Sequence, residues 1–142
     1  MPTSSWYKFE CLSEHLCEGV HDLNADTLKL YLTNSAPNAA THAVKGDLAG
    51  IAEENGYTET DITTATSRTG AVTSITTVDY VEWTASGGSF GPVRYAVVFN
   101  DTPTSPADPL IGYYDYGASI TVADGEKLKV DFGTSLFTVT AT

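Results

Sequence analysis

Apolar side chains recur every three or four residues over the segment 6–23, WYKFECLSEHLCEGVHDL. The five apolar positions of this pattern are Phe9, Leu12, Leu16, Val20 and Leu23. At 3.6 residues per turn, these positions form a narrow stripe along one side of a helix. We therefore predict one N-terminal amphipathic helix over about residues 6–23, packed by its apolar side on the rest of the protein.

Most of the remaining chain alternates apolar and polar residues with a period of two, which is typical of half-buried strands. The segments 27–33, TLKLYLT, and 127–132, KLKVDF, show this alternation. The segment 93–100, VRYAVVFN, is apolar on both sides, as expected of a central strand that is covered on each face. The pattern predicts a mainly β protein, an antiparallel β-sandwich (jelly-roll-like) with the one N-terminal helix.

Two shorter segments complete the predicted organisation. DLAGIAEENGYT, residues 47–58, looks like a short helical turn that ends at Asn55-Gly56. Residues 123–126, ADGE, are typical of a hairpin turn between two strands. Because no linker or repeat divides the chain, we expect residues 1–142 to form a single β-sandwich domain.

The net charge of the protein narrows the classes of molecule that it can bind. The 142 residues carry a formal net charge of −11, with only seven Lys plus Arg. Nucleic-acid phosphates and anionic lipids repel such a surface, so we expect neither nucleic-acid nor membrane binding. The N-terminus lacks a signal-peptide pattern, and no apolar run approaches the roughly 18 residues of a membrane span. We expect synthesis in a cytoplasm, where Cys11 and Cys17 stay reduced.

A serine between glycines raises a catalytic hypothesis. Residues 87–91, GGSFG, fit the G-x-S-x-G pattern, in which a helix follows the nucleophilic serine. Here Pro92 and a β-patterned segment follow Ser89, and all three histidines precede it, whereas α/β-hydrolases place the histidine last. We predict that Ser89 is a turn residue and that the protein is not an enzyme and has no catalytic residue. A small serine hydrolase that uses Ser89 is the alternative.

Cysteines and histidines, which are zinc ligands by type, occur together in the segment 11–21. On the predicted helix, Cys11 and His15 lie on one side of the apolar stripe, and Cys17 and His21 lie on another. The four therefore cannot form one tetrahedral site, although each pair could supply two ligands to a site completed elsewhere. We expect semi-buried thiols and solvated histidines, with no bound metal or cofactor.

Arg94 lies within the apolar segment 93–100, where a guanidinium needs a partner. Asp115 lies similarly within the apolar run LIGYYDYG, residues 110–117. We predict an ion pair between Arg94 and Asp115 inside the fold. An intersubunit contact of Arg94 is the alternative.

Two stretches of the second half resemble a known family. Residues 83–102, WTASGGSFGPVRYAVVFNDT, and 108–132, DPLIGYYDYGASITVADGEKLKVDF, are similar to small virion structural proteins of tailed bacteriophages. The core of the resemblance is SGG-x-x-GP-x-RYAV-x-x-ND followed by PLIG-x-x-DYG-x-S. LKLYLTNSAP and DLAGIAEENGYT in the first half fit the same family, so that the resemblance covers roughly residues 7–133.

The resemblance implies a β-sandwich virion component, made in the host cytoplasm. It implies most of all a capsid decoration (cement) protein that binds the major capsid protein as a homo-oligomer. The alternative is a neck, tail or fibre component that binds other virion proteins. We expect the interaction surface in the polar loops 34–47 and 101–109, together with Trp6 and Tyr7, because exposed aromatic residues are common interface anchors. At a chain end, such residues are also found as lids on a core.

Overall fold

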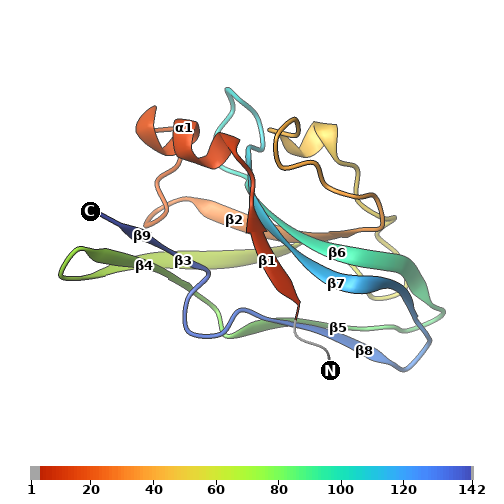
Figure 1. Cartoon of the computed structure of the whole chain (residues 1–142). Coiled ribbons are helices and arrows are strands. Elements are labelled where there is room, and N and C mark those ends of the chain that lie inside the picture. Colours follow the sequence, from red (N-terminus) through yellow and green to blue (C-terminus); the bar gives the residue numbers. More distant parts are fainter. Residues whose placement is uncertain (1–3, 142) are drawn as a thin grey trace.

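The structure is a computed structural model that describes residues 4–141 (Figure 1). Half of the protein is strand and 7% is helix, so the predicted mainly β, antiparallel fold is confirmed. The nine strands are β1 (Ser5–Lys8), β2 (Thr27–Thr33), β3 (Thr60–Thr69), β4 (Val72–Thr77), β5 (Tyr80–Thr84), β6 (Phe90–Asn100), β7 (Leu110–Val122), β8 (Lys127–Asp131) and β9 (Phe137–Thr140).

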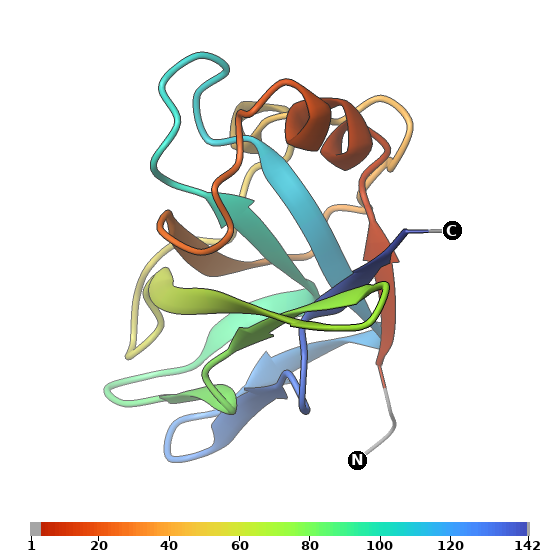
Figure 2. The same cartoon turned by 90° about the vertical axis from the view of Figure 1, so that its left-hand side faces the viewer.

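The strands form two sheets of unequal size. Seven strands form one antiparallel sheet in the order β1-β7-β6-β2-β3-β4-β9, and β5 pairs with β8 in a second sheet. The large sheet curls, and the small sheet lies below it in the view of Figure 1, so that the two enclose a common interior (Figures 1 and 2). This arrangement is sandwich-like, with β1 and β9 as the two open edges of the large sheet.

Hydrophobic side chains fill the space between the sheets. Leu30, Val98 and Ile111 of the large sheet are fully buried, and they belong to the same cluster as Trp83 of β5 and Leu128 of β8. A smaller cluster lies on the other side of the large sheet, where β2, β6 and β7 contribute to it together with Phe9 and Leu48. The large sheet is therefore covered on both faces at its centre.

β6 is the central strand that the sequence pattern predicts. It pairs with β2 on one side and with β7 on the other, and residues 95–100 are all buried. Its pairing with β7 contains a large irregularity, because Val93 pairs with Ile120 whereas Tyr95 pairs with Asp115. Residues 116–119 of β7 therefore bulge away from the ladder.

The N-terminal segment differs from the prediction. One N-terminal helix is present as predicted, but its predicted extent over residues 6–23 is wrong, because Ser5–Lys8 form β1 and the helix α1 covers only Cys11–Cys17. The aromatic residues of β1 favour a strand, which pairs with β7. α1 ends where Gly19 adopts a left-handed conformation with φ +73°. Within the part of the chain described, no helix is long and apolar enough to cross a membrane.

The segment 47–58 also differs from the prediction. A 3₁₀ helix covers Lys45–Asp47, and no helical turn follows it, although a turn does occur at Asn55-Gly56 as expected. Hydroxyl groups of β2 hold the segment against the sheet, since Tyr31 donates to the Leu48 carbonyl over 2.7 Å and Thr33 donates to the Ala49 carbonyl over 2.8 Å. These tertiary hydrogen bonds outweigh the weak helical pattern.

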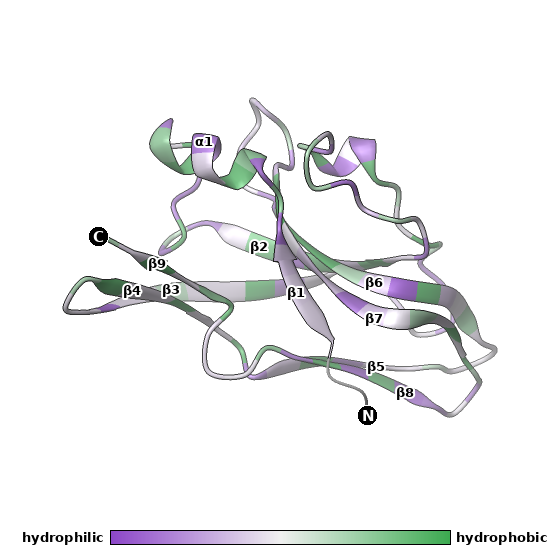
Figure 3. Ribbon diagram, in the orientation of Figure 1, coloured by the Kyte–Doolittle hydropathy of each residue, from purple (hydrophilic) through white to green (hydrophobic). Residues whose placement is uncertain are grey.

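One end of the large sheet extends beyond the hydrophobic core. In what we call the tip, comprising residues 65–74 of β3 and β4 and residues 138–141 at β9, every residue is exposed or half-exposed although the strands are regularly paired. The tip projects at the left of Figure 1, and its ribbon in Figure 3 is mostly pale or green. Arg68 is its only charged residue.

Candidate functional site

The predicted ion pair between Arg94 and Asp115 is present, and it is bidentate. Arg94 donates from Nε to Oδ1 of Asp115 over 2.9 Å and from Nη2 to Oδ2 over 3.2 Å. These hydrogen bonds raise the pKa of Arg94 and hold the pKa of Asp115 below its usual value. Because the two side chains remain 39% and 24% exposed, the pair lies at the surface of the sheet and not in its core.

Asp115 also anchors the bulge of β7. Its Oδ1 accepts a hydrogen bond from the Gly117 N–H over 2.8 Å, and Gly117 has φ +93°. Such a conformation strains residues other than glycine. One carboxylate therefore holds both the guanidinium of β6 and the backbone of the bulge that faces it.

Three tyrosines continue from this ion pair toward the edge of the sheet. The Arg94 guanidinium lies 5.2 Å from the ring centroid of Tyr95, and the Tyr95 and Tyr113 centroids are 6.1 Å apart. Tyr113 in turn stacks on Tyr7 of β1, with 5.3 Å between centroids. We call these five residues, Tyr7, Arg94, Tyr95, Tyr113 and Asp115, the tyrosine face.

The tyrosine face is held in place by its neighbours. Tyr95 is buried, whereas Tyr7 is 47% exposed and offers the accessible ring of the group. Burial, Tyr7 and Asp115 together raise the pKa of Tyr113, so its hydroxyl is neutral near pH 7. The face presents an aromatic, hydrogen-bonding surface with a fixed ion pair, which suits recognition of another protein surface.

Trp6 and Tyr7, which the sequence analysis grouped together, lie on opposite faces of the sheet. Trp6 packs on Tyr114, with ring centroids 4.7 Å apart, and joins the core between the sheets. Gly112 of β7 makes room for it, since a Cβ at Gly112 would lie 2.4 Å from Trp6 Cζ2 and 2.7 Å from the Tyr7 carbonyl oxygen. Trp6 is thus a lid on the core, and Tyr7 is the exposed member of the pair.

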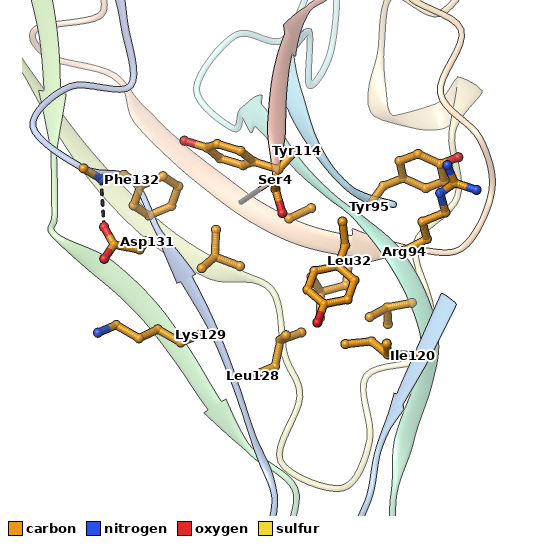
Figure 4. Close-up of a pocket in the computed structure, with 15 residues that line it drawn as sticks. Ser4, Leu32, Arg94, Tyr95, Tyr114, Ile120, Leu128, Lys129, Asp131 and Phe132 are labelled. Atoms are coloured by element: carbon orange, nitrogen blue, oxygen red, sulfur yellow. Dashed lines mark hydrogen bonds between the residues drawn. The ribbon is translucent and has the colours of Figure 1, made fainter. Parts of the chain in front are cut away.

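A cavity of about 530 Å³ opens between the two sheets (Figure 4). Its walls include Leu32 of β2, Tyr114 and Ile120 of β7, and Leu128 and Phe132 at β8. Figure 4 shows these mainly apolar side chains between β8 and the large sheet, with Arg94 at one end of the view. Size and lining fall within the range of small-molecule pockets. None of its described lining residues has a buried polar side-chain atom without a partner, so we assign it no ligand.

Ser89 lies in the connection from β5 to β6, and a strand follows it. Its carbonyl accepts a hydrogen bond from Asn55 Nδ2 over 2.7 Å, which ties the connection to the Asn55-Gly56 turn. This connection and α1 lie at opposite ends of the protein (Figures 1 and 2). The strand–serine–helix context of a nucleophile elbow is therefore missing, because Ser89 lies between the bend at Gly87-Gly88 and the strand β6.

The histidines of the first segment do not lie where an ideal helix would place them. We expected His15 and His21 to be solvated and on different sides, but both are buried, and their ring centroids are 5.7 Å apart. The early end of α1 turns the chain back and brings His21 against His15. His21 Nδ1 lies 3.0 Å from Asn100 Nδ2, and Asn100 also donates to Asp26 over 2.7 Å.

Burial and the neighbouring His15 lower the pKa of His21 to about 4, while Asp26 opposes this shift. Within residues 4–141, no three or more His, Cys, Asp or Glu side chains are placed to hold a metal ion. Cys17 is exposed, and Cys11 is half-buried with its thiol 3.7 Å from the carbonyls of Ala43 and Leu110. Sequence reasoning missed the histidine pair because it assumed one continuous helix.

The two loops named in the sequence analysis come together. Leu110, after the loop 101–109, donates its N–H to Ala43 over 2.9 Å, and Lys45 donates its N–H to Asp108 over 2.9 Å. The loop 34–47 also bonds the start of α1, where Glu10 donates to Ala39 over 2.9 Å. The loops form a joined surface on the α1 side of the large sheet.

Comparisons with known proteins give no further assignment. No protein-family model, no curated protein and no solved structure matches this protein.

Proposed function

We propose that this protein is a structural component of a tailed-bacteriophage virion, and specifically a capsid decoration (cement) protein. In this role it binds the outside of the major capsid lattice and stabilises the head. A neck, tail or fibre component is the alternative, in which the partners are other virion proteins.

The observation that carries the proposal is the position of the motif residues. The motif SGG-x-x-GP-x-RYAV-x-x-ND, residues 86–101, contains β6, and PLIG-x-x-DYG-x-S, residues 109–119, covers most of β7. The two are neighbouring strands, and their Arg and Asp form the bidentate pair of the tyrosine face. The resemblance therefore concerns one folded unit with an outward-facing surface.

The tyrosine face supplies the contact that a cement protein needs. Tyr7 is accessible and stacked on Tyr113, so that little side-chain freedom is lost when a partner covers it. Weak single contacts of this kind become strong when they are repeated over a lattice. The net charge of −11 would favour a basic capsid surface as the partner.

Copy number in the virion tests the proposal most directly. We expect quantitative mass spectrometry to find many copies, and capsids that lack the protein to lose genome at a lower temperature than complete ones. A few copies at one vertex would support the neck, tail or fibre alternative instead.

A rebinding experiment tests the tyrosine face. Purified protein is added to capsids that lack it, and the bound fraction is measured for Tyr7→Ser and for Tyr80→Ser. Tyr80 is a matched control because it is 51% exposed but lies on β5 in the small sheet. We expect Tyr7→Ser to lower occupancy at least tenfold and Tyr80→Ser to leave it unchanged; equal effects would contradict the assignment.

The serine-hydrolase alternative has its own test. Labelling of the protein by a serine-reactive phosphonate, lost in Ser89→Ala, would support it. We expect no such labelling, because the strand β6 follows Ser89 in place of the helix that supports the oxyanion in a nucleophile elbow.

A further inference from the structure

The edge strand β9 lacks the features that usually protect a sheet edge. Natural edges carry charged residues, proline or bulges, which prevent pairing with another chain. Residues 136–141, LFTVTA, contain no charge and no proline, and the pairing of β9 with β4 shows no register shift. β9 thus offers a straight, neutral edge to any strand that can reach it.

The backbone groups on the open side of β9 can be identified. The Ala141 N–H donates to the Ala71 carbonyl over 2.9 Å, and Thr73 pairs with Val139. In an antiparallel ladder, every second residue bonds the same neighbour, so Val139 also bonds β4. The N–H and C=O groups of Thr138 and Thr140 therefore point to the open edge.

Charge distinguishes the tip from the rest of the surface. Each copy has a net charge of −11, yet the tip carries Arg68 as its only charged residue. Two copies repel each other least where neither surface is charged. The tip is also where Val72 and Val139 are exposed, at 37% and 46%.

We propose that two copies of this protein pair through β9, antiparallel and about a two-fold axis at Val139. Thr138 of one copy then exchanges both backbone hydrogen bonds with Thr140 of the other, and symmetry repeats this exchange. Val139 meets its own copy across the axis and loses its exposure to water. The two large sheets become one continuous sheet.

The opposite edge of the large sheet does not offer the same contact. β1 ends in Lys8, whose Nζ lies 5.3 Å from the Phe137 ring centroid, so the lysine covers the base of β9 from the side of β1. A charged residue at an edge disfavours pairing with a second copy. The pairing is therefore expected at Thr138–Thr140 and not at β1.

The first experiment measures the oligomeric state of the purified protein by analytical ultracentrifugation. We expect a dimer that strengthens as salt is added, because salt screens the repulsion between the two acidic copies. Thr138→Pro removes an N–H that points to the open edge, so we expect a monomer whose thermal stability equals that of the unsubstituted protein at dilutions where it is also monomeric. Val139→Pro removes an N–H that bonds β4, so we expect it to lower the thermal stability itself.

The second experiment is disulfide trapping with Val139→Cys in a Cys17→Ser background, which removes the exposed native thiol. Residues that face each other in a non-hydrogen-bonded antiparallel pair have Cα atoms about 4.5 Å apart, within disulfide range. With oxidised glutathione we expect a covalent dimer for Val139→Cys and none for the control Val72→Cys, which lies on β4 away from the axis.

A monomer at every concentration and salt level, a dimer retained by Thr138→Pro, or equal trapping of both cysteine variants would each overturn the pairing. None of these measurements involves a capsid. Failure of the β9 pairing would therefore leave the proposed capsid role untouched, and failure of the capsid role would leave the pairing untouched.

Discussion

The two open edges of the large sheet, β1 and β9, are built from different residues and present different chemical groups. Around β1, aromatic rings and a bidentate ion pair fix side chains in place, and a bulge distorts the ladder. Around β9, small hydroxyl residues lie on a regular, nearly uncharged ladder that projects past the core. The first edge presents specific side chains, whereas the second presents backbone.

This contrast assigns two kinds of contact to one sheet. Ordered aromatic and charged side chains discriminate between partners, because a wrong partner leaves polar groups unpaired. A bare backbone edge pairs with any strand of suitable geometry, and a second copy of the same protein always supplies one. The β1 side is thus suited to another protein and the β9 side to self-association.

The largest expected effect lies on the β1 side, at Gly112. Gly112→Ala places a Cβ about where the Trp6 ring lies, so we expect a loss of about 3 kcal/mol in the free energy of unfolding, measured by chemical denaturation. Gly46→Ala is the control, since no atom lies within 4 Å of its added Cβ. A loss below about 1 kcal/mol for Gly112→Ala would show that Trp6 is not tightly packed.

The second prediction concerns the acid response of His21. The pKa of His21 is near 6.5 in the unfolded protein and about 4 in the folded protein. Between these two pH values only the unfolded state gains a proton. Stability should therefore fall by up to about 3 kcal/mol as pH drops from 6.5 to 4. His21→Gln should flatten this part of the profile. If the pH dependence of stability is the same in His21→Gln as in the unsubstituted protein, another group causes the loss of stability in acid.

The ion pair of the tyrosine face should have a smaller effect. Asp115→Ala removes the partner of both Arg94 and the Gly117 N–H, and because the pair is solvent-exposed we expect a loss of about 1 kcal/mol in the free energy of unfolding. Asp115→Asn keeps the shape and should cost about half as much. Because its folded pKa is lowered, Asp115 stabilises the protein above pH 4 and loses this contribution as pH falls further. Denaturation at pH 7 and pH 3 measures both effects.

The smallest effect is expected at the tip. Thr138→Lys changes an exposed residue of the edge strand, so stability should change by no more than about 0.5 kcal/mol, while the dimer weakens. A larger loss of stability in a monomeric background would mean that the tip contributes to the core. The distinction between the two edges would then fail.

Local alternation was sufficient to predict much of the sheet. β2, β6 and β8 follow from their own residues because a strand with one or two buried faces must repeat every second position. The Arg94–Asp115 pair was predicted from the cost of an unpaired charge among apolar neighbours, and the two residues do pair, although at the surface of the sheet. These inferences need no knowledge of distant contacts.

Where contacts between residues far apart in sequence determine the local structure, the sequence pattern was misleading. β1 exists because it pairs with β7, more than a hundred residues later, whereas the helical stripe that begins at Phe9 led us to extend the predicted helix back over it. His15 and His21 meet because Gly19 ends the helix between them, and a helical wheel drawn past that glycine is wrong. The tyrosine face combines β1, β6 and β7, so its membership could not be predicted from any one segment.

The way in which the two sheets are connected has a consequence for how the protein folds. β6 and β7 pair with each other, and the strands just outside them, β5 and β8, also pair, so residues 80–131 form one hairpin nested within another. The β6–β7 pairing closes a short loop. Once it has formed, the β5–β8 pairing needs only two short further loops to close, so both pairings cost little chain entropy. We expect this nested hairpin to form first, and β1 and β9, which join strands far away in sequence, to dock last.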